Sequence, residues 1–443
     1  MPNHNSKNGV SMQTTPKILI AGGSVRAATD SAVRGGWQVI AYDQYGDLDL
    51  QESSIWQSLP AETEKWSLDP THVAQVQGWT YTGPFENWSA DAVEFSEQAE
   101  KCSIPLLGAT PQLLKRIRDP RFLQETVASI GGNPLAVILP GQIATSASRP
   151  ATQVDPDQIQ EWIRKPLHSG GGFNVRDVSQ AHITEESLHL SLNELEYLQE
   201  KVYGVPQSCI FMASSSRVER IGWTEGLIGT PWGKYGYRGS VGPITVPQAI
   251  DELACSLANA IVKATGLSGI LGIDGIRCKE SWRPIEINPR YTASCEILEG
   301  TVGHPPSLMD LHLRAWQNFR TWQSEFMPPC FKSASVSSGE KKAEKSLHQS
   351  ASEDLLQRPH FGCKQIVYAG ETFHAPDLRA HWLNSDSHRS PVIADIPMPG
   401  TLISSGSPVC TLFGWGASIA EARRQCSEHW SQLTTRFPAL KLD

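Results

Sequence analysis

The chain has 443 residues, of which 40% are hydrophobic, and a formal net charge of -8. This length suffices for roughly two to four structural units, and no apolar run approaches the length of a membrane span. The acidic balance and the lack of a Lys/Arg cluster interleaved with aromatic residues argue against nucleic acid as a partner. We therefore expect a cytoplasmic protein that contacts neither membranes nor nucleic acids.

The N-terminal part predicts two units. Residues 1–15 are polar and predict a flexible start, whereas residues 16–118 predict an open α/β domain. KILIAGG at 17–23 and WQVIAYD at 37–43 are typical of buried strands, and the stretch between them favours a loop and a helix. DAVEFSEQAEKC favours a helix, and IPLLGATPQLLKRIRD a strand, a turn and a helix that begins near Pro111.

Residues 119–331 predict an α+β domain whose strands surround a cleft. Four strand patterns, EWIRKPL, YLQEKVYG, SCIFMAS and RVERIGW, precede the long helical pattern VPQAIDELACSLANAIVKATG. Residues 332–356 are rich in Ser, Lys and Glu, which predicts a disordered linker. Residues 357–443 alternate strand and turn signals before a helix that starts at Ser418, and they predict a small β-rich C-terminal domain.

The strand pattern IEINPR at residues 285–290 carries polar side chains where a buried strand would have apolar ones. Because strand side chains alternate, we expect Glu286 and Asn288 on one face and Ile285 and Ile287 on the other. A carboxylate beside an amide oxygen suits Mg²⁺, which completes its coordination with water and nucleotide phosphates.

The preceding strand pattern, GILGIDGIRC, contains Asp274. A neighbouring antiparallel strand would bring this second carboxylate to the same ion. An exposed edge on which Glu286 pairs with Arg290 is the alternative interpretation of these residues.

Two further stretches are typical of nucleotide contacts. WIRKPLHSGGGFNV predicts a strand that ends at Lys165-Pro166, then a glycine loop whose N–H groups approach a phosphate while the lysine supplies charge. The loop lacks the ending of a P-loop, and a plain hairpin turn is the alternative. YLQEKVYG predicts a hinge that breaks at Gly204, with backbone at 199–202 for an adenine edge and Glu200 or a nearby acid for the ribose.

In this order and spacing, these stretches resemble the ATP-grasp superfamily of carboxylate–amine ligases. The resemblance covers residues 16–315 and includes the Gly-Ala-Thr-Pro turn at 108–111. It implies ATP and Mg²⁺ as cofactors, with Mn²⁺ as an alternative ion. It also implies that a small-molecule carboxylate attacks ATP, that an amine captures the acylphosphate, and that ADP and phosphate are released. The oligomeric state stays open, a homodimer included.

The resemblance assigns roles residue by residue. Lys165 resembles the phosphate lysine, and Arg290 resembles the group that steadies the transferred phosphoryl group. The other implied positions are Ser169, Gly170, Gly171 and Gly172 in the loop, Gln199, Glu200, Lys201 and Val202 in the hinge, and Asp274, Glu286 and Asn288 as magnesium ligands.

One position departs from the family pattern. Many members open the ATP domain with an Asp-Lys pair whose lysine also touches phosphate, but RDPRF gives Asp119-Pro120 here. Arg118 and Arg121 are both candidates to supply the charge.

Substrate contacts are less defined by the sequence. The loop that contains Arg26 opens toward the cleft in the family, and Arg238 and Ser240 lie in TPWGKYGYRGSVGP. Arg238 suits two parallel hydrogen bonds to a carboxylate, and a solvated glycine-rich loop is the alternative. We expect Cys295 and His312 to pack rather than to react.

Other functions compete with an amide-forming ligase. Bicarbonate is the activated acid in a purine- or biotin-type carboxylase, and a degenerate nucleotide-binding regulator would account for the missing lysine. AGGSVRAA followed by Asp43 has the setting of a nicotinamide site but not its glycine spacing. Among ligases, EINPRYTAS and ADIPMPGT resemble members in tetrahydromethanopterin- and methanofuran-linked cofactor biosynthesis.

Overall fold

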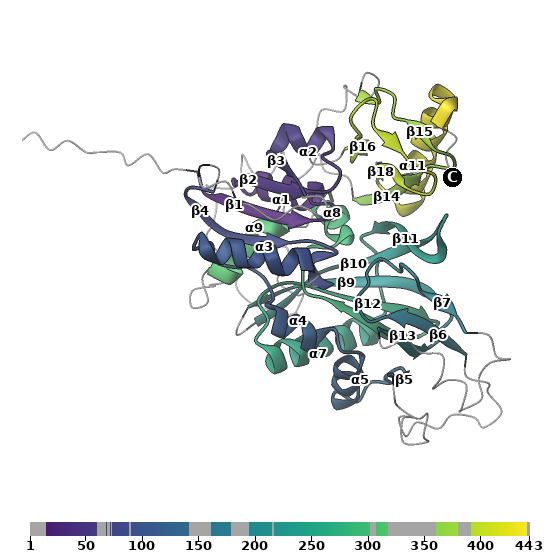
Figure 1. Ribbon diagram of the computed structural model, residues 1–443. Helices are drawn as coiled ribbons and strands as arrows, with labels where there is room; N and C mark the ends of the chain where they lie inside the picture. The colour runs from purple at the N-terminus through teal and green to yellow at the C-terminus, as the bar shows by residue number, and fades with distance from the viewer. Residues whose placement is uncertain are drawn as a thin grey trace, which may run out of the picture.

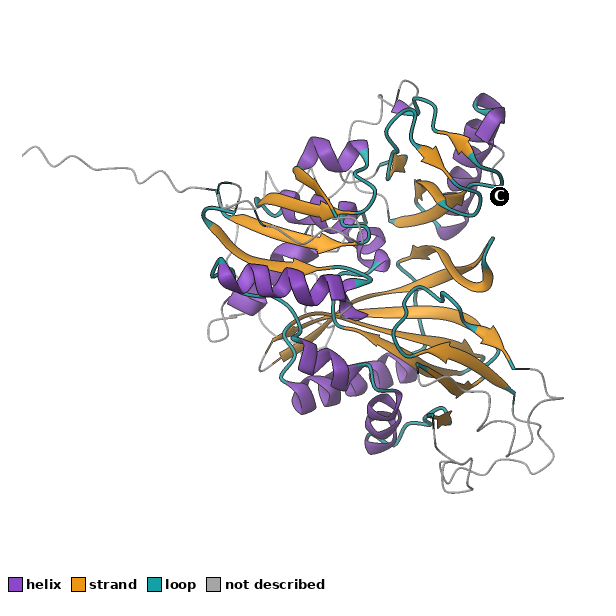
Figure 2. Cartoon of the chain, in the orientation of Figure 1, coloured by secondary structure: helices purple, strands orange, loops and turns teal. Residues whose placement is uncertain are grey.

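The protein is described by a computed structural model over residues 15–59, 68, 71, 73–87, 90–140, 161–178, 195–214, 217–301, 307–317, 360–379 and 391–440. The predicted linker at 332–356 lies outside these residues, as does the predicted flexible start except for Thr15. Figures 1 and 2 show an N-terminal α/β unit, a large central sheet with helices, and C-terminal strands with a helix.

The N-terminal unit is a four-stranded parallel sheet in the order β3-β2-β1-β4. These strands are Ile55–Ser58, Gln38–Asp43, Lys17–Gly22 and Val76–Tyr81. Both faces of β1 are buried: Leu19 joins a core that contains Phe95 of α3 (Ala90–Lys101), and Ile18 joins one that contains Ala28 of α1 (Arg26–Arg34). Burial on two faces explains the continuous apolar run of this strand.

The central sheet has eight antiparallel strands in the order β13-β12-β9-β10-β11-β14-β18-β16. In chain order they are β9 Val205–Ser214, β10 Arg217–Thr230, β11 Gly233–Gly242, β12 Gly269–Cys278, β13 Ser281–Asn288, β14 Phe361–Tyr368, β16 Ile393–Ala394 and β18 Pro408–Gly416. Helix α7 (Gln248–Thr265) packs on it through Leu257 and Ile261, which are fully buried.

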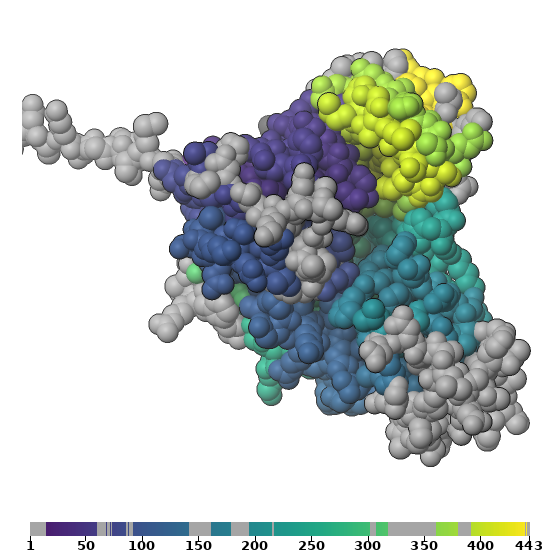
Figure 3. All heavy atoms as spheres, viewed as in Figure 1, coloured from purple at the N-terminus to yellow at the C-terminus, as the bar shows by residue number. Residues whose placement is uncertain are grey.

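The C-terminal strands continue the central sheet rather than forming a separate one. Ser240 of β11 pairs with Lys364 of β14, and α11 (Ile419–Arg436) covers this end through Ala422 and Leu433. In Figure 3 the yellow C-terminal segment lies beside the purple N-terminal unit, and the Leu48 N–H donates to the Ile396 carbonyl across that contact at 2.8 Å.

A smaller antiparallel sheet, in the order β5-β8-β6-β7, faces the central one. Its strands are Val137–Ile138, Glu196–Glu200, Trp162–Pro166 and Arg176–Asp177. The connecting and smaller elements are α2 Leu48–Ser53, η1 Phe85–Asn87, α4 Pro111–Ile117, α5 Pro120–Ser129, α8 Ala293–Glu299, α9 Leu308–Gln317, β15 Phe373–His374, β17 Leu402–Ile403 and η6 Pro438–Leu440. The two sheets enclose the cleft that the strand patterns predict.

One alternative interpretation is excluded and one local prediction is wrong. The stretch that contains Arg238 is strand β11 of a hairpin, which excludes the alternative of a solvated glycine-rich loop. Its glycines serve close backbone packing, since a Cβ at Gly239 would lie 2.0 Å from the Lys364 carbonyl oxygen. The strand predicted after Ile104 is reduced to an isolated bridge between Leu106 and Trp79. No helix in the described ranges is long and apolar enough to cross a membrane.

Candidate active site

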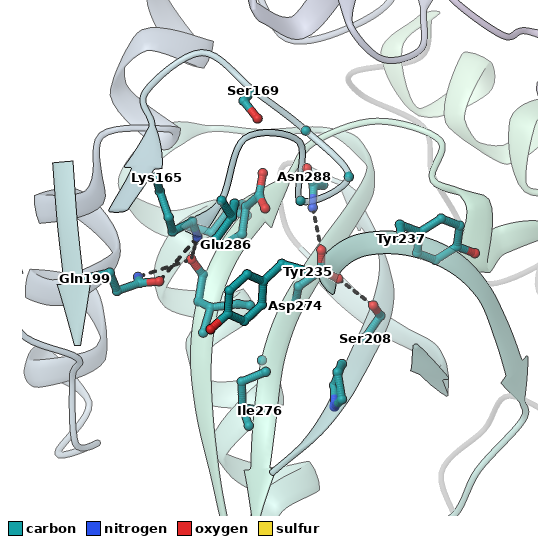
Figure 4. A pocket seen from close by; sticks show the side chains of 18 of the residues that line it. Lys165, Ser169, Gln199, Ser208, Tyr235, Tyr237, Asp274, Ile276, Glu286 and Asn288 are labelled. Atoms are coloured by element: carbon teal, nitrogen blue, oxygen red, sulfur yellow. Dashed lines mark hydrogen bonds between the residues drawn. The ribbon is translucent and has the colours of Figure 1, made fainter. Parts of the chain in front are cut away.

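Strands β12 and β13 place two carboxylates opposite each other. Asp274 pairs in register with Glu286, and Gly272 with Asn288, so the predicted approach of the second carboxylate is confirmed. Asp274 accepts hydrogen bonds from Ser208 Oγ at 2.5 Å and from Asn288 Nδ2 at 2.8 Å. Figure 4 shows these side chains side by side on neighbouring strands.

A bulge modifies the predicted alternation of β13. The register shifts between Asp274 and Gly275, so that Gly275 faces Pro284 and Ile285 is the extra residue. Both residues line the cavity, but Ile287 is buried in the apolar core as expected, whereas Ile285 is only half-buried and is not part of that core. The expectation for Ile285 was wrong because simple period-two alternation does not allow for an inserted residue.

The oxygen atoms of this edge fit a hard divalent cation. Asn288 donates through its amide nitrogen, so its amide oxygen keeps lone pairs for a cation. Burial and the nearby Glu286 raise the pKa of Asp274 to about 6. A bound Mg²⁺ would offset the repulsion between the carboxylates of Asp274 and Glu286 and would favour their charged forms.

Lys165 on β6 is a buried cation at the base of the glycine loop. Its Nζ donates to Gln199 Oε1 at 3.3 Å and to the Ile285 carbonyl oxygen at 3.5 Å. Burial alone would lower the pKa of Lys165, but Tyr197 and Glu286 outweigh burial and raise it. Lys165 therefore stays charged, as a phosphate-binding lysine must be.

The glycine loop lies against the β10–β11 hairpin. Gly171 and Gly172 have φ values of 62° and 75°, and the Tyr237 N–H donates to the Gly171 carbonyl at 2.8 Å. A Cβ at Gly172 would lie 2.0 Å from the Tyr235 carbonyl oxygen. Only glycine permits both this backbone conformation and this close approach.

The hinge has few backbone groups left for a ligand. The Glu200 N–H donates to Ala136 and the Lys201 N–H to Glu161, each at 2.8 Å. Within the described part of the chain the Val202 N–H has no partner. It is the hinge donor that remains for an adenine edge.

The Glu200 carboxylate has structural partners. It accepts from the Ala136 N–H at 3.1 Å and pairs with Arg283 at 3.4 Å. Lys201 pairs with Glu161 at 3.0 Å and with Asp177, just after the glycine loop, at 3.1 Å. These ion pairs join the hinge to Glu161 and to strand β7.

One cavity of about 310 Å³ gathers the predicted nucleotide and metal residues. Its lining includes Lys165, Ser169, Gly170, Gly171, Gly172, Gln199, Glu200, Lys201, Val202, Asp274, Glu286, Asn288 and Arg290. Their individual roles stay predictions.

The predicted substrate residues lie elsewhere. Arg26 is 1% exposed and bonds to Asp395 at 2.9 Å and to Glu296. Arg238 is not in the cavity lining, and Ser240 lies just behind it, bonded to Tyr237 at 2.7 Å. The structure therefore does not bring Arg26, Arg238 and Ser240 together with the nucleotide residues.

Of the two candidate arginines, the cavity contains Arg118. Arg121 is not in the lining; it pairs at 2.6 Å with Asp119, which caps α5, while Pro120 is the first residue of that helix. The Asp-Pro departure therefore has a local explanation as a helix start.

Sequence reasoning missed Ser208 and Tyr235 as members of the site. Ser208 contacts Asp274 because β9 lies beside β12, and Tyr235 lines the cavity because the hairpin bends toward the loop. Tyr235 lies in TPWGKYGYRGSVGP, a stretch that the sequence associates with substrate through Arg238 and Ser240, and Ser208 lies in the strand pattern SCIFMAS. Neither residue is marked individually, because its place in the site depends on strand neighbours that are distant in sequence.

Comparison with known proteins agrees with this arrangement. Residues 136–294 match a family model described as an ATP-grasp domain, so the chain contains an ATP-grasp domain with its cavity between two sheets. No curated protein matches the sequence.

Solved structures share the fold over nearly the whole chain. N5-carboxyaminoimidazole synthase from Aspergillus clavatus, in complex with ADP and 5-aminoimidazole ribonucleotide, is 17% identical, with 95% of this chain and 99% of that chain covered and a TM-score of 0.59. Biotin carboxylase from Campylobacter jejuni, in complex with β-γ-ATP, is 13% identical, with 96% and 92% covered and a TM-score of 0.61.

A third structure is the biotin carboxylase domain dimer of Hydrogenobacter thermophilus 2-oxoglutarate carboxylase, in complex with MgADP, ADP and bicarbonate. It is 14% identical, with 91% of this chain and 87% of that chain covered and a TM-score of 0.58. This chain thus shares its fold with these three structures over nearly its whole length.

Proposed function

We propose that the protein is an ATP-dependent ligase that activates a carboxylate as an acylphosphate and joins it to an amine, with release of ADP and phosphate. The observation that supports this proposal is the single cavity that combines a glycine loop, a buried lysine, a backbone hinge and an edge of oxygen donors. This combination suits a nucleoside triphosphate bound together with a divalent cation better than it suits the nucleotide alone or the cation alone.

Each part of the cavity has a distinct task in the proposal. The hinge binds the base through the Val202 N–H, and Lys165 and the loop N–H groups bind phosphate oxygens. Asp274, Glu286 and Asn288 would hold Mg²⁺, which supplies neutralisation of charge on the phosphates. Arg290 lines the cavity just beyond Asn288, which supports a role in steadying the γ-phosphoryl group.

The proposed reaction has two transfers. A carboxylate oxygen of the substrate forms a bond to the γ-phosphorus while the bond to the β,γ-bridging oxygen breaks, and ADP leaves. The amine nitrogen then attacks the acyl carbon, the C–O bond to phosphate breaks, and the nitrogen loses a proton. No protein nucleophile is needed, in agreement with Cys295, which is fully buried and whose pKa burial raises to about 12.

The identity of the acid is the finer part of the proposal. An organic acid in the biosynthesis of a tetrahydromethanopterin- or methanofuran-type cofactor rests on the sequence resemblance alone. Bicarbonate is the second candidate, because the similar biotin carboxylase domain binds bicarbonate together with MgADP. Incorporation of labelled bicarbonate into an acid-labile product would distinguish the two.

The proposed activity is tested by ADP formation in a screen of carboxylates and amines. Glu286→Gln should leave thermal unfolding unchanged and reduce ADP formation by about 100-fold or more, because it removes one charge from the carboxylate edge. Glu252→Gln, on the exposed face of α7, is the matched control and should keep wild-type turnover. Wild-type rates in Glu286→Gln would contradict the metal assignment.

A further inference from the structure

The end of helix α4 places the positively charged side chain of Arg118 between the glycine loop and Glu286. Arg118 is the C-cap residue of α4, its side chain is 11% exposed, and it lines the cavity. Its Nη2 donates to the Ser169 carbonyl at 2.5 Å and lies 3.6 Å from Glu286 Oε1. One guanidinium therefore contacts both the glycine loop and the carboxylate edge.

The backbone around Arg118 is fixed by the helices on both sides. Its N–H donates to the Leu114 carbonyl at 2.9 Å, and Asp119 immediately begins the cap of α5. Arg121 lies one turn further, with a side chain that is 52% exposed. The two arginines are close in sequence, but only Arg118 reaches the cavity.

The charge of Arg118 has a specific consequence for the carboxylate edge. A guanidinium at ion-pair distance from Glu286 neutralises part of the charge that a divalent cation would bind, and it repels that cation. A guanidinium also has five N–H donors, so it can keep the Ser169 carbonyl while other donors turn to a polyanion.

We propose that Arg118 is a positioning residue that couples the occupancy of Glu286 to the placement of the glycine loop. This inference rests on the proposed function. Without nucleotide, Arg118 pairs with Glu286 and thereby weakens the binding of a cation to this carboxylate. With a cation on Glu286 and nucleotide phosphates in the cavity, Arg118 is released toward the phosphates while its bond to Ser169 holds the loop over them.

This proposal predicts that one substitution strengthens the binding of a cation and weakens the binding of nucleotide. In Arg118→Gln, Mn²⁺ alone should bind the nucleotide-free protein about threefold tighter or more, because competition for Glu286 is lost. The same variant should bind a nonhydrolysable ATP analogue with Mg²⁺ about tenfold more weakly, because a charged hydrogen bond is lost. A purely structural role would weaken both, and a purely phosphate-binding role would leave Mn²⁺ unchanged.

The experiment uses the full chain, with Mn²⁺ binding followed by electron paramagnetic resonance and the loop followed by hydrogen exchange. We expect faster exchange across the Ser169–Gly172 segment in Arg118→Gln. Arg121→Gln should match wild type in every measurement. Arg118→Lys, which keeps the charge, should restore weak Mn²⁺ binding.

Failure of this inference is distinguishable from failure of the proposed function. If the wild-type protein binds both Mn²⁺ and the analogue but Arg118→Gln binds Mn²⁺ no more tightly, the role of Arg118 is overturned. If the wild-type protein binds neither ligand, the proposed nucleotide site fails, and the Arg118 proposal fails with it.

Discussion

Lys165 shows how neighbours decide the state of a single side chain. It is only 9% exposed, and its ammonium group lies 5.7 Å from the centre of the Tyr197 ring, where a cation is attracted to the ring face. Together with the bonds to Gln199 and the Ile285 carbonyl, this environment compensates the cost of burial. The lysine is thus fixed in place by protein contacts alone.

We expect Lys165→Ala to weaken ATP binding by about 10- to 100-fold, which corresponds to the loss of a charge-assisted hydrogen bond. Isothermal titration of the full chain with an ATP analogue measures this change. Lys263→Ala, on the exposed side of α7, serves as the control. Unchanged nucleotide affinity in Lys165→Ala would count against the assignment.

At the same scale, the sequence revealed only part of the carboxylate edge. The alternation of β13 correctly grouped Glu286 with Asn288, because period two is a local property of any strand. The bulge that keeps Ile285 out of the apolar core was not predictable, since it depends on how β13 pairs with β12. Residue patterns alone do not specify such a shift in register.

Among the elements, the glycine loop depends most on its partner. Its position is set by contacts with the β10–β11 hairpin: the Tyr237 N–H bonds to Gly171, and the Phe173 and Trp232 rings meet edge to face at 5.4 Å. The loop therefore lies over the cavity because the hairpin holds it there.

Gly172→Ala should displace the loop, because the new Cβ would collide with the Tyr235 carbonyl. Gly171→Ala shares the strain of a positive φ, but its nearest neighbour, Tyr237 Cβ, is 3.9 Å away. We expect the first variant to bind the ATP analogue at least about tenfold more weakly than the second, with similar melting temperatures. Equal affinities in both variants would show that the close approach is unimportant.

Helix α9 carries a histidine that packs, as expected. His312 Nδ1 accepts from the Ile270 N–H at 3.0 Å, and Nε2 lies 3.0 Å from the Leu107 carbonyl, so Nε2 holds the proton. Burial lowers the pKa of His312 from 6.5 to about 4. Its neutral ring ties β12 to the N-terminal unit.

The lowered pKa of His312 determines how the free energy of unfolding changes with pH. Between pH 6.5 and 4 the unfolded chain protonates His312 while the folded chain does not, so stability is lost as pH falls through this window. The loss amounts to about 3 kcal/mol. In denaturant unfolding, the stability advantage of wild type over His312→Gln should shrink by about this amount from pH 6.5 to 4. For the exposed control His374→Gln, the difference in stability from wild type should not change between pH 6.5 and 4.

At the scale of the whole molecule, one buried carboxylate joins three parts of the chain. Glu296 on α8 pairs with Arg26 of α1 and, at 2.8 Å, with Lys364 of β14. Burial alone would raise the pKa of Glu296, but Arg26 and Lys364 outweigh burial and lower it to about 2. The N-terminal unit and the C-terminal strands are thereby fixed to the helix that follows Arg290.

Removal of the Glu296 carboxylate should lower the free energy of unfolding more than removal of the Lys364 ammonium group. Lys364 has Glu296 as its ion-pair partner among the described residues, whereas Arg26 also bonds to Asp395. We expect Glu296→Gln to lower the free energy of unfolding by about 3–5 kcal/mol, and Lys364→Met by clearly less, since Glu296 keeps Arg26. Equal losses in denaturant unfolding would contradict this ranking.

The sequence by itself determined the local chemistry: which residues belong to strands, a glycine loop and a hinge, and which side chains carry oxygens for a cation. These properties depend on neighbours within a few positions, where periodicity and side-chain type are sufficient. The tertiary structure alone decided that Arg118 rather than Arg121 enters the cavity, and that Arg26 is held by carboxylates instead of facing the nucleotide residues. It also decided that the C-terminal strands extend the central sheet, because strand pairing and burial join segments that lie far apart in the chain.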